Sequence, residues 1–325
     1  MAGGVGSRLY PISTPEKPKQ FLDLLGVGKS LIQLTYERFL AVDPSAHFWV
    51  VTSAAYHKYI REQLPAIPDE QILLEPVARN TAPCIAYVSW KIAQRYPDAR
   101  VVVAPSDAYV PDIQAFAKTV NDALEFVEIS PRASLGRDDK GAIVTIGITP
   151  DNPCTEYGYI HIKTPDQVGG DTGVMPDPSA VMPDPSAVMP DPSAVIPSEV
   201  EGSHISKVSE FKEKPSKEVA EQYLAEGGYF WNAGIFVYGV QTMIAQLREF
   251  VPAIAALMDQ LAPSLYSAAE TPALAEIFPQ CEKISIDYAV MERSPLVFMA
   301  PSSWSWSDLG SFEAIEKVTG KKLNR

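Results

Sequence analysis

The stretch MAGGVGSRLYPISTPEKPKQF (residues 1–21) opens the chain with three glycines close together: Gly3, Gly4 and Gly6. Glycines let a backbone pass close to a ligand and turn its N–H groups toward phosphate oxygens. Arg8 offers a planar fork for two phosphate oxygens, and Lys19 offers a compact positive charge. We therefore expect this loop to hold phosphate.

Two other kinds of phosphate loop compete with this interpretation. The dinucleotide pattern GxGxxG needs a third glycine at position 9, which is Leu9. The Walker pattern GxxxxGK[ST] matches GVGKS at 26–30, but its first glycine would be Asp23, whose carboxylate opposes a triphosphate. We expect residues 26–30 to form a turn that leads into a helix. The favoured pattern is GGxGxR followed by PKxF, which residues 3–8 and 18–21 match.

The first half of the chain alternates strand-like and helix-like segments. Short apolar, β-branched runs, typical of strands covered on both faces, lie at 47–52, 71–76, 99–107 and 142–149. Stretches with apolar residues at helical spacing lie at 29–42, 80–96 and 111–128. This alternation predicts an α/β domain with a mainly parallel, doubly wound sheet. Ligands of such sheets bind at the carboxyl ends of the strands, where EPVARNTAP and PSDAY follow two of the runs.

The second half contains an exact repeat. Residues 174–194 are three copies of VMPDPSA, and two prolines in every seven residues exclude a helix. We expect a disordered insertion at 165–204. Without it, EYGYIHIK and ISKVSEFKEKP would form a hairpin. Beyond the hairpin we expect a helix at 216–228, a strand entering WNAGIFVY, and a helical region at 240–280.

Composition excludes several classes of protein. A net charge of −13 over 325 residues argues against a nucleic-acid partner, because such a surface repels a polyanion. No apolar run approaches the ~20 residues of a membrane span, and we expect no signal segment before the glycines. The three cysteines lack CxxC spacing, which favours reduced thiols and a cytoplasmic location.

Eight motifs together carry a resemblance to a known family. The loop AGGVGSRLYPISTPEKPKQFLDLLG resembles the signature of the sugar-1-phosphate nucleotidyltransferases, and within them of the guanylyltransferases that act on mannose 1-phosphate. The other blocks follow in family order: EPVARNTAP, PSDAYV, EYGYI, FKEKP, WNAGIFVY, SIDYAVME and WSDLGSF. The resemblance implies a Rossmann-like, doubly wound mixed sheet of the GT-A-like type with a helical C-terminal part, forming one domain over 1–325.

The resemblance also implies a reaction. GTP and mannose 1-phosphate would give GDP-mannose and pyrophosphate, with Mg²⁺, by in-line attack on the α-phosphorus. A sugar phosphate has its second pKa near ~6, so its oxygen needs no general base. Two alternatives stay open: a related enzyme for another base or sugar, and an inactive nucleotide-sugar-binding paralogue. The expected partners are the two substrates, and a homodimer stays open.

The resemblance assigns roles around the phosphates. The three loop glycines would cradle the nucleotide, Arg8 would hold the departing pyrophosphate, and Lys19 would bridge the reacting phosphates. Lys17 is a weaker candidate, because the family's PKQ lysine matches Lys19. Asp107 and Asp308 would ligate Mg²⁺, which prefers hard oxygen ligands.

Two further groups of residues would recognise the base and the sugar. The nucleotide-binding set after one strand is Glu75, Arg79, Asn80 and Thr81. The Glu75 carboxylate would accept from the guanine N1–H and amino group, whereas the alternative is a plain strand end with Asn80 as a helix cap. The set that would hold mannose and its phosphate is Gly158, Glu213, Lys214, Asn232 and Asp287.

Three features depart from the family pattern. Ala108 stands where the family usually has His after the metal-binding Asp. We expect no cupin-like isomerase domain of the kind found in bifunctional relatives, and therefore no mannose-6-phosphate isomerisation. The family also has an apolar strand before the glycines. We expect the start to fall within that strand and the loop to be poorly anchored.

Overall fold

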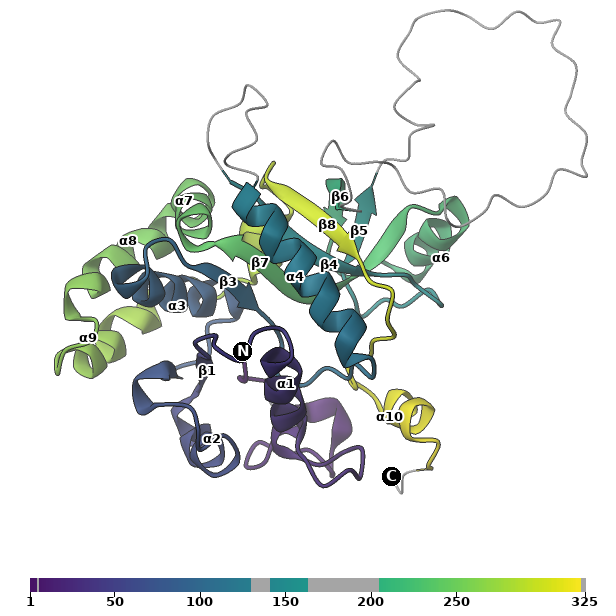
Figure 1. The fold of residues 1–325 in the computed structure, drawn as a ribbon, viewed down its shortest axis with the longest axis horizontal. Helices are drawn as coiled ribbons and strands as arrows, with labels where there is room; N and C mark the ends of the chain where they lie inside the picture. The colour runs from purple at the N-terminus through teal and green to yellow at the C-terminus, as the bar shows by residue number, and fades with distance from the viewer. Residues whose placement is uncertain (5, 130–140, 163–204, 323–325) are drawn as a thin grey trace, which may run out of the picture.

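The structure is a computed structural model that describes residues 1–4, 6–129, 141–162 and 205–322. A six-stranded sheet forms its centre, in the order β3-β7-β4-β8-β6-β5, with an additional pairing of β7 to β5. These strands are β3 (Arg100–Val103), β4 (Ile143–Ile148), β5 (Tyr159–Ile162), β6 (Ser206–Lys212), β7 (Tyr229–Gly239) and β8 (Val297–Pro301). Helices cover the sheet on both faces (Figure 1).

The sheet is mixed, which confirms the mixed sheet that the family resemblance implies, whereas the mainly parallel sheet expected from the alternation alone is wrong. β4 and β8 pair in parallel, but β7 runs antiparallel to β3, β4 and β5, and β6 antiparallel to β5 and β8. An apolar run shows that a strand is buried and leaves its direction open. The long strand β7 arrives from the second half of the chain and inserts between β3 and β4.

The helices divide into two layers, each with its own apolar core. One core joins a sheet face to α3 (Thr81–Arg95), α7 (Val240–Phe250), α8 (Pro252–Leu261) and α9 (Glu270–Ile277). The other joins the opposite face to α4 (Ile113–Ile129) and α6 (Lys217–Glu226). The predicted helices at 80–96, 111–128, 216–228 and within 240–280 are therefore confirmed. No helix in the described ranges is long and apolar enough to cross a membrane.

A smaller part of the fold holds the start of the chain. It contains α1 (Leu31–Leu40), β1 (Val50–Ser53), α2 (His57–Gln63) and β2 (Ile72–Glu75), while α10 (Phe312–Thr319) packs beside α1 and the glycine loop. β1 and β2 form a separate parallel pair. The Ala2 N–H donates to the Val51 carbonyl (2.9 Å), and the Met1 carbonyl accepts from the Ser106 N–H (3.1 Å). The first two residues thus bridge β1 and the end of β3.

An apolar cavity of about 760 Å³ continues from this bridge between the two sheets. Its walls include Ile32 on α1, Val50 on β1, Ile85 on α3 and Val101 on β3. In the described part of the chain, β1 pairs only with β2 and β3 only with β7. Two strand edges therefore face the cavity without a strand between them.

The predicted hairpin is confirmed. β5 pairs with β6 antiparallel from Tyr159↔Lys212 to Ile162↔Val208. The repeat-containing insertion expected at 165–204 lies outside the described residues, and it stays a prediction.

Candidate active site

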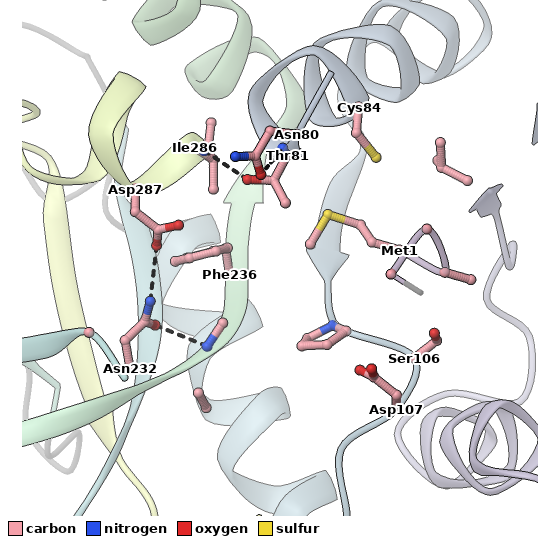
Figure 2. Close-up of a pocket in the computed structure, with 18 of the residues that line it drawn as sticks. Met1, Asn80, Thr81, Cys84, Ser106, Asp107, Asn232, Phe236, Ile286 and Asp287 are labelled. Carbon is pink, nitrogen blue, oxygen red and sulfur yellow. Dashed lines mark hydrogen bonds between the residues drawn. The ribbon is translucent and has the colours of Figure 1, made fainter. Parts of the chain in front are cut away.

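A cavity of about 460 Å³ opens at the ends of β2 and β3, where the strand-end motifs were expected to meet. Figure 2 shows Asn232 and Asp287 on one side of this cavity, and Met1 and Asp107 on the other. The predicted residues that line it are Gly3, Gly4, Glu75, Arg79, Asn80, Thr81, Asp107, Gly158, Glu213, Lys214, Asn232 and Asp287. Widely separated parts of the sequence are thus brought to one place.

The glycine loop forms one wall of the cavity. Gly6 has a φ of +59°, and a Cβ there would lie 2.6 Å from Ser13 Oγ, so only glycine fits. The side-chain amide of Gln20 donates to the carbonyls of Ala2 (3.2 Å) and Gly4 (3.0 Å) from a buried position. Among the described residues, no hydrogen bond occupies the N–H groups of Gly3 and Gly4. They remain available to a ligand.

Lys19 lies at the centre of a charged cluster beside the cavity. Its buried ammonium donates to the Asp308 carbonyl (2.6 Å) and lies 3.2 Å from Asp107 Oδ2. The Tyr109 and Ser307 backbones exchange two hydrogen bonds, of 2.8 and 3.1 Å. This short bridge joins the segment after β3 to the segment before α10. It explains how two aspartates far apart in the sequence come together around one lysine.

The two aspartates suit a divalent cation that arrives with a nucleotide. In the described ranges, no group of three or more His, Cys, Asp and Glu side chains could hold a metal ion on its own. Mg²⁺ typically takes one or two protein carboxylates and completes its shell with water and substrate phosphates. Asp107 and Asp308, each about one-quarter exposed, match that donor set.

Arg8 lies at the rim of the cluster. Its guanidinium forms an ion pair with Glu156 and lies 4.0 Å from Asp308 Oδ2. More than half of the Arg8 side chain is exposed. It is therefore accessible to an anionic ligand, which would have to displace Glu156.

Glu75 ends β2 with its carboxyl group turned into the cavity. Burial raises the pKa of this carboxyl to about 7, although the nearby N-terminal amine opposes the shift. Its Oε1 is buried and has no hydrogen-bond partner among the described residues. An unpaired buried acceptor is costly unless a ligand donates to it.

The residues after Glu75 line the cavity and also form hydrogen bonds with other parts of the protein. Asn80 (φ +66°) caps α3 by accepting from the Thr81 N–H (2.9 Å), so the helix-cap alternative describes its side chain. The Thr81 hydroxyl accepts from the Ile286 N–H (2.8 Å). The Arg79 guanidinium donates to the Pro279 carbonyl. These bonds hold the segment before Asp287 against the start of α3.

The opposite wall carries the residues predicted for the sugar. Asn232 donates its N–H to the Gly158 carbonyl (2.8 Å) and its amide to Asp287 Oδ1 (3.1 Å). A Cβ at Gly158 would lie 2.6 Å from Glu213 Oε2, so a side chain at this position would have to displace the Glu213 carboxylate. Lys214 forms an ion pair with Glu213. Burial, and next the Glu213 charge, raise the pKa of Asp287 to about 7.

The comparisons with known proteins agree with this arrangement. The family model described as nucleotidyl transferase matches residues 1–170 and 195–325. The chain belongs to the nucleotidyl transferase family. It is 32% identical over 99% of its length to "Mannose-1-phosphate guanylyltransferase 2" of Escherichia coli O157:H7. It is also 32% identical over 98% to "Mannose-1-phosphate guanylyltransferase ManC" of Salmonella typhimurium. The chain spans 59% and 58% of these curated relatives.

A solved structure supports the fold of this nucleotidyl transferase. A crystal structure from Thermus thermophilus, described as a "mannose-1-phosphate geranyltransferase", matches with a TM-score of 0.75 and 28% identity. The match covers 99% of this chain and 78% of that one.

The Walker-like segment is part of the transferase's scaffold. The N–H groups of Gly26, Val27 and Gly28 donate to the Asp23 carboxylate at 2.8, 3.0 and 2.7 Å. Lys29 pairs with Glu37 on α1. The donors that would hold a triphosphate in a Walker loop are therefore used within the protein.

Sequence reasoning missed three residues that contact the glycine loop, Arg8 or Asp308: Gln20, Glu156 and Tyr157. All three lie inside motifs already singled out, PKQF and EYGYI, but their contacts join distant segments. Ala108, where the family has His, is buried, and its carbonyl accepts from Arg38 (3.2 Å). The position therefore belongs to the core in this chain.

Proposed function

We propose that this nucleotidyl transferase transfers GMP from GTP to mannose 1-phosphate and releases pyrophosphate. The observation that carries the proposal is the single cavity between the glycine loop and the Gly158–Asn232 wall. It unites a loop with free N–H donors, a buried carboxylate and a polar pocket, and it borders the Lys19 cluster. The names of the relatives support the choice of substrates.

The residues suit displacement at phosphorus without a general base. The nucleophile is a phosphate oxygen that is ionised at neutral pH, and no described histidine lines the cavity. Catalysis then rests on orienting two anions and stabilising charge as it moves to pyrophosphate. Lys19 would hold the reacting phosphates, and Arg8 would take the leaving pyrophosphate in place of Glu156.

The base and the sugar would occupy opposite walls. Glu75 would accept from the guanine N1–H and amino group, the donors that adenine lacks in that combination. Glu213, Asn232 and Asp287 would hold sugar hydroxyls, and Lys214 would neutralise the sugar phosphate. Arg79 and Thr81 would keep these walls in register through their contacts with Pro279 and Ile286, and Asn80 would cap the start of α3.

Mg²⁺ is the cofactor that the two aspartates fit. Asp107 and Asp308 would hold it, and the ion would neutralise phosphate charge when bound with the nucleotide. Lys19, which contacts the Asp107 carboxylate and the Asp308 backbone carbonyl, would keep the two aspartates in place.

Transfer of label tests the proposal. GTP labelled at its α-phosphorus should give labelled GDP-mannose and unlabelled pyrophosphate when mannose 1-phosphate is present. Label recovered only in GTP or GMP would reject the transferase proposal. Labelled product with another sugar phosphate alone would favour the related-enzyme alternative. Tight GTP binding with no product from any sugar would favour the inactive paralogue.

A further inference from the structure

Tyr157 connects the Gly158–Asn232 wall of the cavity to Asp308 in the Lys19 cluster. Its ring packs between Trp231 and Trp306, with centroid distances of 5.1 and 5.0 Å. Its hydroxyl donates to Asp308 Oδ1 at 2.8 Å. The neighbouring Gly158 is fixed by its bond to Asn232. The hydroxyl therefore reaches Asp308 from a rigid site.

The two oxygens of Asp308 have different surroundings. Oδ1 accepts from the Tyr157 hydroxyl and from the Gly310 N–H (2.9 Å), so both of its lone pairs are used. Oδ2 has one charged neighbour among the described residues, the Arg8 guanidinium at 4.0 Å. The Asp308 backbone is itself held by Lys19. The carboxylate is thus fixed through one oxygen and presents the other.

We propose that Tyr157 is a positioning residue, which orients Asp308 so that Oδ2 alone is offered to the divalent cation. This inference rests on the proposed function for the role of Asp308 as a metal ligand. Hydrogen bonds to ligating carboxylates fix their orientation, and their loss typically lowers metal affinity or activity by about 10–100-fold. The packing of the Tyr157 ring does not depend on its hydroxyl, so Tyr157→Phe removes the bond and keeps the shape.

The chain supplies a matched control. Tyr159 lies two residues further on, and its hydroxyl donates to the Cys154 carbonyl (3.0 Å), with no hydrogen bond to either aspartate among the described residues. Tyr159→Phe removes one tyrosine hydroxyl bond from the same segment. Tyr159→Phe should leave the affinity for the metal within about 2-fold of the parent protein. Loss of a tyrosine hydroxyl that only stabilises the fold is expected to have no larger effect.

The test is a titration with Mn²⁺, followed through the EPR signal of free Mn²⁺. It is run with protein alone and with protein plus GTP, against GTP without protein. We expect Tyr157→Phe to weaken protein-bound Mn²⁺ by about 10–100-fold. The Mg²⁺ concentration for half-maximal activity should rise in proportion, with kcat largely restored at saturating Mg²⁺.

Two results would overturn the inference, and they are distinguishable. If Asp308→Asn loses Mn²⁺ but Tyr157→Phe binds it as tightly as the Tyr159→Phe control, Asp308 is a ligand and Tyr157 does not position it. If Asp308→Asn itself binds Mn²⁺ normally, the proposed metal site fails and the role of Tyr157 fails with it. Neither outcome depends on which sugar phosphate the enzyme uses.

Discussion

Lys19 is the residue that the proposed function places on the reacting phosphates. Its buried ammonium contacts Asp107 and the Asp308 carbonyl, whereas Lys17, two positions earlier, is exposed. We expect Lys19→Ala to lower kcat by about 10²-fold or more and to raise the KM for GTP much less, because the charge acts mainly in the transition state. Steady-state kinetics of Lys17→Ala, expected to change much less, supply the control. Equal effects of the two substitutions would show that the lysines are wrongly assigned.

If Glu75 binds guanine as proposed, its carboxyl should make nucleotide binding depend on pH. Its pKa is raised to about 7, and only the ionised form accepts two hydrogen bonds from guanine. GTP affinity should therefore increase as the pH rises through about 7, and Glu75→Gln should abolish that dependence. Calorimetric titrations on both sides of that pH measure it, with Glu70→Gln, an exposed partner of Arg95, as the control. A parent protein whose GTP affinity is flat over this range would exclude the role.

The raised pKa of Glu75 also makes the free energy of unfolding fall as the pH rises. Because the folded pKa of Glu75 lies above its ordinary value of 4.5, folding favours the protonated carboxyl. Its contribution is fully present below about pH 4.5 and is lost as the pH rises through about 7. Glu75→Gln should therefore gain stability relative to the parent between these values, in urea unfolding at a series of pH values. A difference in unfolding free energy between the two proteins that stays constant across that range would contradict a raised pKa of Glu75.

At the scale of elements, local patterns predicted more than long-range ones. Helical periodicity correctly placed α3 and α4, because an amphipathic face is visible in a short window. The alternation alone gave the wrong strand directions, because the antiparallel partner β7 lies far along the chain from β3, whereas the family resemblance implied the mixed sheet. Arg79 likewise contacts Pro279, 200 positions away, and no local signal marks that bond. The motifs therefore pointed to residues that line one cavity, and the fold supplied the contacts between distant segments.

The β5–β6 hairpin gives a prediction about the insertion. Ile162 pairs with Val208, so the strands meet directly on both sides of the repeat-containing segment. Loop-closure entropy grows only logarithmically with length, so shortening the connection should change stability by no more than ~1–2 kcal/mol. Deleting residues 172–203 should leave the kinetics within a few-fold and thermal stability equal or slightly higher. A deletion protein that folds but no longer binds mannose 1-phosphate would assign the segment to the sugar pocket.

At the scale of the whole molecule, we expect the cavity of about 760 Å³ between β1 and β3 to limit the stability of the fold. An apolar strand placed there would bury its side chains against residues such as Val50 and Val101, and it would pair with both strand edges. Each well-buried Val or Ile side chain contributes roughly 1.5–3 kcal/mol of transfer free energy. An engineered extension of a few β-branched residues before Met1 should therefore raise the melting temperature by several degrees.

The control for that extension is a Gly/Ser segment of equal length, which adds chain without apolar surface. Both proteins are compared by calorimetry and by amide exchange of β1 and β3. Equal melting temperatures for the two extensions would show that the cavity does not accept a strand.

The central claim is that one cavity selects GTP and mannose 1-phosphate together. It is tested most directly by pyrophosphate release over a grid of four nucleoside triphosphates and several sugar 1-phosphates with Mg²⁺. We predict that kcat/KM for GTP with mannose 1-phosphate exceeds every other pair by on the order of 10²-fold, because a mismatched base leaves the buried Glu75 acceptor unpaired. A different pair with the highest kcat/KM, or no release from any pair, would contradict the account.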